Sequence, residues 1–532
     1  MLTRTEEKLY LRPNVQMEPL VNQWPAWPQL IAPATAAMNI AYLHLKILKS
    51  FIMAPDLHAA TLKDPAMRGG LFLNLDPRRV DEVKALSERT MKEQAHMISL
   101  AEAIKALNLM LINEANGYSL ECLYQKVPPI LKGYVELVYD LNNQPSVLFI
   151  EGLLYHSPYY DPSRQSIYLA PLDTDDRPFL YMTPRFANGH SVHVDIPFKH
   201  QALDDFFAMR ATPQTFEYIK DRLGFSDDDN EKFRTLLTTD PPRQTHKYDG
   251  DGVRVRYLNH ACLLIETKDV SILTDPLVAY EYDRELPCLS YADLPEVLNY
   301  VLITHGHADH LVLETMLQLR HKIETVIIPR SGGATLEDPS LKLILQQIGF
   351  KNVVEIDILE SIPIEGGSIT GLPFLGEHAD LNIRSKIAHL VQLQGKSILS
   401  ATDSRNVSPE VYEKVHEIVG DIDVLFLGME CDGAPFSWAY GQLATGKLAR
   451  EMDQSRRLSG SDYKLGMEIV NALHCRQAYV YAMGQEPWLH YLTSIHYTDQ
   501  SKPIIESNKL VEACRSKNIL SERLYGSKEI CL

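Results

Sequence analysis

Three histidines and an aspartate lie close together in the second half of the chain. His305, His307, Asp309 and His310 form an H-x-H-x-D-H pattern directly after the short apolar run 300–304. Residues two apart in an extended loop point the same way, so His305 and His307 can share one metal ion. Asp309 and His310 are expected to open a helix at 309–319 and to reach a second ion. Because imidazole and carboxylate are usual ligands of first-row metals, the spacing predicts a binuclear metal site.

Three further carboxylates follow predicted strands. Asp403 lies at the end of a strand at 397–401, where a carboxylate can bridge two metals. Asp275, in the segment 272–276, is interpreted either as a partner that orients a ligating histidine or as a plain turn former. Glu430 ends a strand at 423–430 and is either a seventh ligand or part of a pocket wall or cap.

The segment 373–380 decides which metal is expected. The H-x-H-x-D-H pattern is that of the metallo-β-lactamase superfamily, whose hydrolases supply a third histidine to the first metal here. This sequence offers Glu377 and His378, and because adjacent strand residues face opposite ways, only one is expected to ligate. Ligation by His378 favours a zinc hydrolase. Ligation by Glu377 gives a harder, carboxylate-rich site that suits ferric iron.

A histidine expected late in the superfamily fold is missing. The predicted strand 478–482 runs into Met-Gly-Gln-Glu-Pro-Trp without one. The second metal therefore either keeps an open position, as an O₂-activating centre needs, or receives another ligand. His474, His490 and His496 are interpreted as surface or pocket residues.

The chain length of 532 residues predicts two domains, at 1–245 and 246–532, because single hydrophobic cores rarely exceed about 250–300 residues. The seam is the Pro-, Asp- and Gly-rich stretch 238–252. Helical periodicity at 34–52 and 80–111, a hairpin at 134–141 and 146–155, later strands, and short helices at about 214–224 and 227–237 predict a mixed α+β N-terminal domain, in which nothing suggests catalysis. Many short strands with interspersed helices predict an α/β, αββα sandwich for the second half.

Composition narrows the partners and the compartment. With 52 basic and 69 acidic side chains the formal charge is −17, which argues against nucleic acid or an anionic membrane as the main partner. Seven scattered cysteines, no signal peptide at 1–7, and polar interruptions in the apolar stretch 34–52 favour a cytoplasmic protein without a membrane span.

The chain resembles the diiron β-hydroxylases of nonribosomal peptide biosynthesis, the CmlA-like family of antibiotic pathways such as that of chloramphenicol. The resemblance rests on Glu377 in Leu-Gly-Glu-His, on Asp403, on the missing late histidine, on the Trp-Pro-Ala-Trp-Pro stretch at 24–28 and on overall length. It implies a non-haem diiron monooxygenase with two Fe ions, oxo-bridged when oxidised, and O₂ as co-substrate. The implied ligands are His305, His307, Asp309, His310, Glu377 and Asp403, with Asp403 bridging. Glu377 is also the expected catalytic gate, through a change in how it binds iron when substrate enters.

The resemblance also implies substrate and partners. The expected substrate is an aminoacyl group on a phosphopantetheinylated peptidyl carrier domain of a nonribosomal peptide synthetase, hydroxylated at its β-carbon. An external electron donor reduces the irons, and the N-terminal domain serves homodimerisation and carrier docking. The ligands do not encode which amino acid is hydroxylated.

Two other functions stay open at this point. One is a dinuclear zinc hydrolase of a lactone, thioester or phosphoester, in which a metal-bound hydroxide attacks the substrate; the other is a non-catalytic binding protein. Aromatic residues at 430–438 and 485–490 either line a substrate tunnel or pack as ordinary loops. The basic run of Lys447, Arg450, Arg456 and Arg457 either docks an acidic carrier or is a solvated helix face.

Overall fold

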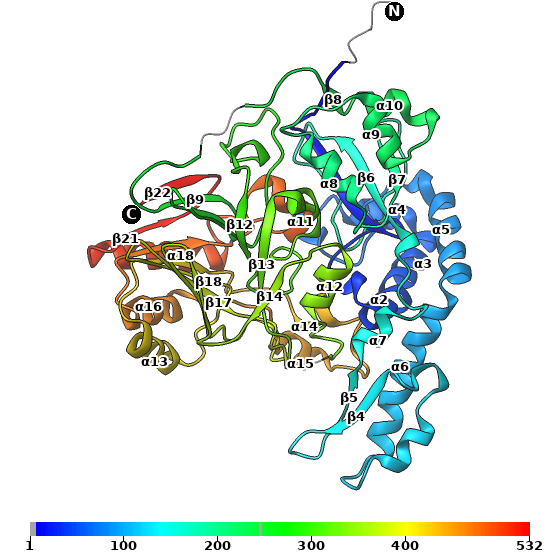
Figure 1. Ribbon diagram of the computed structural model, residues 1–532. Helices are drawn as coiled ribbons and strands as arrows, with labels where there is room; N and C mark the ends of the chain where they lie inside the picture. Colours follow the sequence, from blue (N-terminus) through cyan, green and yellow to red (C-terminus); the bar gives the residue numbers. More distant parts are fainter. Residues whose placement is uncertain (1–6, 244–246, 333) are drawn as a thin grey trace, which may run out of the picture.

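The computed structural model describes residues 7–243, 247–332 and 334–532. The predicted boundary at 245/246 and part of the predicted seam fall at residues 244–246, which lie outside the described ranges. So do residues 1–6, to which most of the signal-peptide interpretation applies. Figure 1 shows the two halves of the chain side by side, with the hairpin β4–β5 and part of α6 projecting beyond both.

Two seven-stranded sheets form the second half within the described ranges. The first runs β14-β13-β12-β11-β10-β9-β22 and the second β15-β16-β17-β18-β19-β20-β21. The first sheet comprises β9 (Arg254–Asn259), β10 (Cys262–Glu266), β11 (Ser271–Thr274), β12 (Leu298–Leu302), β13 (Ile323–Pro329), β14 (Val353–Ile356) and β22 (Lys528–Cys531). The second comprises β15 (Ser361–Ile364), β16 (Gly367–Leu372), β17 (Ala388–Leu393), β18 (Lys396–Thr402), β19 (Val424–Gly428), β20 (Gln477–Tyr481) and β21 (Leu520–Arg523).

The two sheets pack face to face. Branched and aromatic side chains from both meet in one buried cluster that includes Val255, Leu263, Ile272, Val391, Ile398 and Phe426. A second cluster joins the other face of the second sheet to the helices α13 (Pro409–Val419), α16 (Tyr463–Ala472) and α18 (Lys502–Ser516). Helices α11 (Leu313–Leu319) and α12 (Leu341–Gln347) contribute to the core on the opposite side. The predicted αββα sandwich is confirmed.

The N-terminal half is built around a four-stranded antiparallel sheet in the order β3-β2-β6-β7. Its strands are β2 (Val15–Val21), β3 (Trp24–Pro25), β6 (Gln165–Pro171) and β7 (Val192–Asp195). The predicted helix at 34–52 is present as α2 (Pro33–Asn39), a π-helical turn (Ile40–His44) and α3 (Leu45–Met53). The predicted helix at 80–111 is divided at Gln94 into α5 (Val80–Glu93) and α6 (Ala95–Glu114). The mixed α+β prediction is confirmed.

The hairpin prediction was partly wrong. Its strands are β4 (Val135–Tyr139) and β5 (Pro145–Phe149), and the continuation to residue 155 is the helix α7 (Glu151–Tyr155). Among the described residues one helix, α6, could cross a membrane by length and composition, and 39% of the 18-residue window concerned is buried in the protein. A single helix of this kind is weak evidence for a membrane span, because the core helices of proteins without a span can have the same length and composition.

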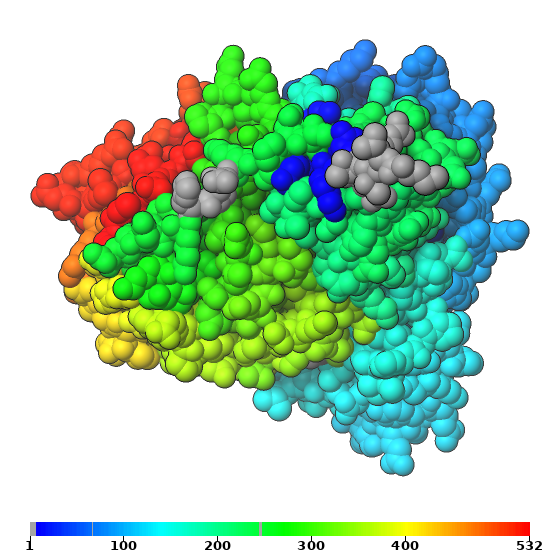
Figure 2. Space-filling view, turned by 45° about the horizontal axis from the view of Figure 1, so that its top comes forward, coloured from blue at the N-terminus to red at the C-terminus, as the bar shows by residue number. Residues whose placement is uncertain are grey.

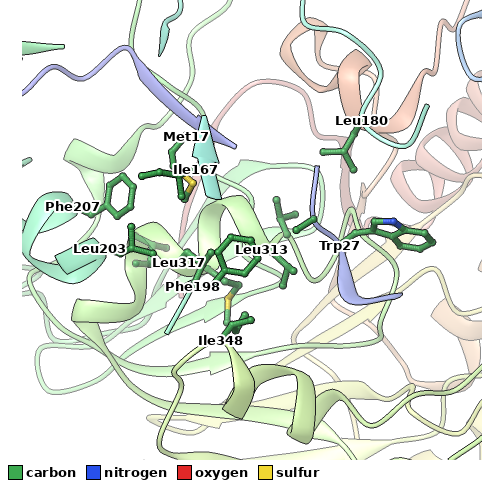
Figure 3. Packing of buried hydrophobic residues seen from close by; sticks show 14 of the residues in the cluster. Met17, Trp27, Ile167, Leu180, Phe198, Leu203, Phe207, Leu313, Leu317 and Ile348 are labelled. Carbon is green, nitrogen blue, oxygen red and sulfur yellow. The ribbon is translucent and has the colours of Figure 1, made fainter. Parts of the chain in front are cut away.

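Both halves share one hydrophobic core. Figure 3 shows Met17, Ile167 and Phe207 of the first half beside Leu313 and Leu317 of α11. A buried ion network crosses the same boundary: the Arg177 guanidinium lies 2.9 Å from a carboxylate oxygen of Glu18 and 2.7 Å from one of Glu314 on α11. The space-filling view shows the two halves in contact along a broad front (Figure 2). The N-terminal half therefore clamps the helix that follows the histidine cluster.

Candidate metal centre

The histidine cluster occupies the loop between β12 and α11. β12 lies between β11 and β13 in the parallel part of the first sheet, so the loop leaves its carboxyl end. The prediction that Asp309 and His310 open the helix was wrong, because α11 begins only at Leu313. Both residues lie in a turn closed by the bonds from the His310 and Leu311 amides to the His307 carbonyl.

Donor atoms converge in three overlapping groups, each within 4.8 Å. His305, His307, Glu377 and His378 form the first group; His260, Asp309 and His310 form the second; and His305, His310 and Asp403 form the third. The third group joins the other two, because Asp403 Oδ2 lies 3.9 Å from His305 Nε2 and 2.9 Å from His310 Nε2. The structure thus brings together all six residues predicted from the sequence, together with His378, the alternative named beside Glu377, and it adds His260.

Several of these atoms are buried without a hydrogen-bond partner. His310 Nε2 lies 2.9 Å from Asp403 Oδ2, and Glu377 Oε2 lies 2.8 Å from His378 Nδ1, yet neither nitrogen–oxygen pair has hydrogen-bond geometry. Both ring nitrogens of His260 also lack a partner. An unsatisfied buried polar group costs about 1–3 kcal/mol, so several such atoms in one place indicate a ligand that binds them. Lone pairs that converge without bonding one another fit metal cations between them.

The segment containing Glu377 and His378 is irregular rather than a strand. β16 ends at Leu372, and Gly376, Glu377 and Ala379 all have positive φ angles, of 65°, 64° and 51°. The alternation of a strand therefore does not apply, and both side chains lie in the same donor group. Which of the two ligates a metal stays a prediction. Glu377 Oε1 lies 3.3 Å from His307 Nδ1, and the His378 ring stacks on His307.

Asp275 contacts the cluster from behind. Its carboxylate accepts bonds from the Thr304 amide (2.8 Å) and hydroxyl (2.6 Å) and lies 2.9 Å from His310 Nδ1. The bond to Nδ1 turns His310 Nε2 toward Asp403 and fixes the ring. Of the two interpretations of Asp275, the partner that orients a histidine is the one the contacts support. On the opposite side, the Tyr440 hydroxyl lies 2.7 Å from His307 Nε2.

His260 was missed by the sequence analysis. It lies in the turn between β9 and β10 with φ of 47°, and its Nε2 is 3.2 Å from Asp309 Oδ2. Its carbonyl accepts a bond from the Ala482 amide, directly after β20. His260 thus lies beside the strand end where the late histidine was expected. The only signal in the sequence is a polar Asn-His pair inside an apolar hairpin.

The other candidate histidines lie outside these groups. His474 belongs to a separate group with His416 and Asp421, and the rings of His490 and His496 lie 4.1 Å apart. Glu430 is in no donor group formed by the described residues, although it lines the adjoining cavity.

The carboxylates and imidazoles of the cluster shift each other's pKa values. Burial raises the pKa of Glu377, but the neighbouring His307 and His378 outweigh burial and hold that pKa well below its usual range. Burial lowers the pKa of His310, but Asp403 and Asp309 outweigh it and raise that pKa well above its usual range. The carboxylates thus stabilise the protonated imidazoles beside them, and a bound metal ion would take the place of those protons.

A cavity of about 500 Å³ opens onto the donor groups. From the second half it is lined by His307, Asp309, Glu377, Asp403 and Glu430, among others, and from the first half by Trp27, Gln29, Leu43, Tyr181 and Met182. The N-terminal half, where the sequence suggested no catalytic role, therefore builds part of the wall. The prediction of a lining role holds for 430–438, which supplies Glu430 and Trp438. For 485–490 it does not; residues 492–495 line the cavity instead.

Comparison with known proteins places this architecture. Residues 10–241 match the diiron non-heme beta-hydroxylase N-terminal domain, and residues 271–437 match the beta-lactamase superfamily domain. The chain is 35% identical over 524 residues to the 4-amino-L-phenylalanyl-[CmlP-peptidyl-carrier-protein] 3-hydroxylase of Streptomyces venezuelae, covering 97% of this chain and 98% of that enzyme. The crystal structure of CmlA, a diiron beta-hydroxylase from Streptomyces venezuelae, matches with a TM-score of 0.93 at 34% identity, covering 99% of this chain and 100% of that one.

Similarity to hydrolases is much more limited. A metal-dependent hydrolase of Methanopyrus kandleri is 31% identical over 124 residues, which is 23% of this chain and 46% of the hydrolase. The zinc-hydrolase alternative is therefore not favoured, whereas similarity to the β-hydroxylase spans both halves. The chain belongs to the family of diiron non-haem β-hydroxylases, enzymes that use two iron ions and O₂, here on a metallo-β-lactamase fold.

Proposed function

We propose that this chain hydroxylates the β-carbon of an aminoacyl group tethered to a phosphopantetheinylated peptidyl carrier domain of a nonribosomal peptide synthetase. One observation carries the proposal: a carboxylate-rich donor cluster opens onto a cavity whose wall both halves of the chain build. Over those same two halves the chain matches a hydroxylase named for a carrier-bound amino acid.

The proposed ligand set follows the donor groups. His305, His307 and Glu377 would hold the first iron, Asp309 and His310 the second, and Asp403 would bridge them. The unpartnered atoms of Glu377 and His310, together with the place of Asp403 between the groups, support this assignment. Bound iron supplies the O₂ chemistry that side chains lack. Whether His260 or Glu430 adds a further ligand is decided by the metal content of their variants.

The residues of the chain position the substrate and exclude water. Trp27 packs edge-to-face on Tyr181, and Tyr181 packs edge-to-face on Trp438, so three aromatic rings form a continuous wall. Such a wall suits an apolar or aromatic aminoacyl side chain. Glu377 lines the same cavity, so an arriving substrate would contact it. This contact supports the proposed gating role of Glu377, in which substrate entry changes how its carboxylate binds iron.

The partners and the compartment are proposed on the same basis. We propose that residues 1–245 form the dimerisation and carrier-docking domain, that 246–532 form the catalytic domain, and that an external donor supplies electrons in the cytoplasm. The basic run predicted for docking is only partly available. Arg456 donates to the Ala379 carbonyl and Arg457 lies 3.5 Å from Asp432, whereas Lys447 and Arg450 are exposed.

The test is metal analysis with an optical spectrum, on protein expressed with both iron and zinc available. The expected result is about two irons per chain and near-ultraviolet absorption that bleaches on reduction, as expected for an oxo-bridged pair of ferric ions. Carrier-tethered aminoacyl substrates are then screened by mass for the gain of one oxygen atom. Two zincs, a featureless spectrum and hydrolysis of the thioester would contradict the proposal. A Glu377→Asp variant whose reaction with O₂ still depended on substrate as in the parent would count against the gate.

A further inference from the structure

Two short half-buried segments from opposite halves of the chain line the cavity next to the exposed His496, and we take this part of the cavity as its mouth. Gly69 and Gly70 lie on one side, and Thr493, Ser494 and Ile495 lie on the other. These segments touch: a Cβ atom at Gly69 would lie 3.2 Å from Ser494, and the Trp438 indole donates to the Gly69 carbonyl at 3.0 Å.

Three nitrogen-bearing side chains flank these two segments. Arg68 directly precedes the glycine pair, while His490 and His496 bracket the segment 493–495. The two imidazole rings lie 4.1 Å apart, so they form one surface rather than two separate positions. The Arg68 guanidinium lies close enough to both rings to lower their pKa values. The three groups therefore form a cluster, which we call the mouth cluster.

The mouth cluster is short of negative charge. Among the described residues, no carboxylate lies within 4 Å of the Arg68 guanidinium. Asp175 is the carboxylate that acts on His490, and it already pairs with Tyr282 and Arg284. Burial, followed by His496 and Arg68, lowers the pKa of His490 to about 4, so its imidazole is neutral at pH 7 and can donate an N–H bond. The Ser494 hydroxyl, also at the mouth, is buried without a hydrogen-bond partner.

The inner end of the cavity lies at the proposed metal centre. Glu377 and Asp403 line it as proposed iron ligands, so their charge would be taken up by the metal centre and the reacting end of a substrate would lie there. The basic groups beside the outer segments, in a chain whose overall charge is −17, suit an anion on the outer part of the same ligand. An aminoacyl-phosphopantetheine has this arrangement, with the amino acid at one end and a phosphodiester at the far end of the arm.

We propose that Arg68, His490 and His496 bind the phosphodiester of the phosphopantetheine arm at the mouth of the cavity, with the Ser494 hydroxyl as a further donor. The proposal rests on the proposed function and names the part of the carrier-bound substrate that this chain recognises outside its metal centre. Arg68 supplies the charge, because a guanidinium stays protonated and binds phosphate in a fixed geometry. The imidazoles supply neutral N–H donors.

The test compares two probes that differ only in the phosphate. Binding of 4′-phosphopantetheine and of pantetheine to the iron-loaded enzyme is measured by calorimetry. The phosphorylated probe is expected to bind about tenfold more tightly, equivalent to about 1.4 kcal/mol. Arg68→Ala and the double variant His490→Ala/His496→Ala should each remove most of that preference, and Arg68→Lys should retain part of it. Arg330→Ala removes one positive charge at a residue paired with Asp357 and Glu360, and it should leave the preference intact.

Three results would overturn the proposal that the mouth cluster binds the phosphodiester. They are equal binding of the two probes by the parent enzyme, an undiminished preference of Arg68→Ala for the phosphorylated probe, or inorganic phosphate binding as tightly as phosphopantetheine. Turnover separates this outcome from failure of the proposed function. Arg68→Ala should raise KM for the carrier-bound substrate about tenfold with kcat, iron content and optical spectrum unchanged. If the parent enzyme hydroxylates a carrier-bound amino acid without any phosphate preference, the mouth proposal fails alone. If it hydroxylates none, the proposed function fails whatever the probes show.

Discussion

The two ends of the metal cluster are held in different ways. The second donor group is fixed by the fold: Asp275, at the end of β11, binds both Thr304 and His310, and α11 behind it is clamped by the Arg177–Glu314 pair. The first donor group is instead held by a loop and a short helix that border cavities. Glu377 comes from an irregular loop, and His307 is held by Tyr440 on α14 (Phe436–Tyr440).

This difference indicates where a substrate can be sensed. Trp438 and Ala439 of α14 line the metal-side cavity, whereas Phe436 and Tyr440 of the same helix line a separate cavity of about 250 Å³. A ligand that presses on one side of α14 acts on an element that bonds directly to His307. The second group also reaches the cavity through Asp309, but Asp275 holds its His310 from the side away from the cavity, so we expect it to stay fixed while the first responds.

The largest effect is expected from Asp403→Ala, which removes the residue between the two groups. Without it the two irons would lose the ligand proposed to bridge them, so iron content should fall well below two per chain and turnover should fall on the order of a thousandfold or more. Atomic absorption and a carrier-bound turnover assay measure both. Asp432→Ala is the matched control, because Asp432 lines the same cavity and belongs to no donor group. If Asp403→Ala retained two irons per chain, Asp403 would not be the ligand that bridges them.

A large effect on stability is expected at the clamp behind the second group. Burial raises the pKa of Glu18, but Arg185 and Arg177 outweigh it and hold that pKa at about 2, below the usual 4.5. A carboxylate with a depressed folded pKa stabilises the protein above its unfolded pKa and loses that contribution as pH falls toward the folded value. Glu18→Gln should therefore lower the free energy of unfolding by about 3–5 kcal/mol at pH 7. The difference should narrow between pH 4.5 and about pH 2.

Urea denaturation across this pH range measures the effect. Glu82→Gln, which breaks the half-exposed pair with Arg79, is the control and should change stability by about 1 kcal/mol or less. A Glu18→Gln effect as small as that of the control would show that the clamp contributes little to the rigidity of the second group.

Asp275→Asn tests the fixation of His310 directly. Asparagine keeps the size of the side chain but loses the charge that pairs with the imidazole Nδ1–H, so metal affinity should fall by about 10–100-fold. Competition with a chelator, read on iron-loaded protein, measures the loss. Circular dichroism should stay unchanged if the role is to orient His310. Unchanged affinity would leave Asp275 as a turn former, which its φ angle of 34° also allows.

Residues of the two donor groups could be predicted from the sequence where they lie close together in the chain, and not where distant segments bring them together. The six predicted donor residues were found because four lie within six positions and the other two follow recognisable strands. The contact of Asp275 with His310 depends on β11 and β12 being neighbours, which periodicity does not reveal. His260 and Tyr440 each approach the cluster from a distant part of the chain, so no local pattern marks them.

The N-terminal half illustrates the same limit. Its helices and strands were predicted because periodicity is local, although the break at Gln94 carries no proline or glycine to signal it. The role of Trp27 and Tyr181 in the cavity wall was not predicted, since it exists only where two halves with different folds meet. The irregular backbone at Glu377 likewise defeated the strand argument, although Gly376 beside it is a residue that favours turns.

The smallest effect is expected from Tyr440→Phe, which removes a single hydroxyl from the first group. In the proposed ligand set Nδ1 of His307 would bind iron and its Nε2–H would donate to the Tyr440 oxygen, so the variant would lose one bond while the ring keeps its packing against Phe436. Metal content should stay near two, and kcat should fall by about tenfold or less, in line with the loss of one buried hydrogen bond. The decisive measurement is the optical spectrum with and without bound substrate. If α14 carries the response to substrate, the spectral change on binding should shrink in Tyr440→Phe but persist in Phe436→Leu, which alters the same helix without touching His307. An equal spectral change in Tyr440→Phe and the parent would show that substrate is sensed at Glu377 alone.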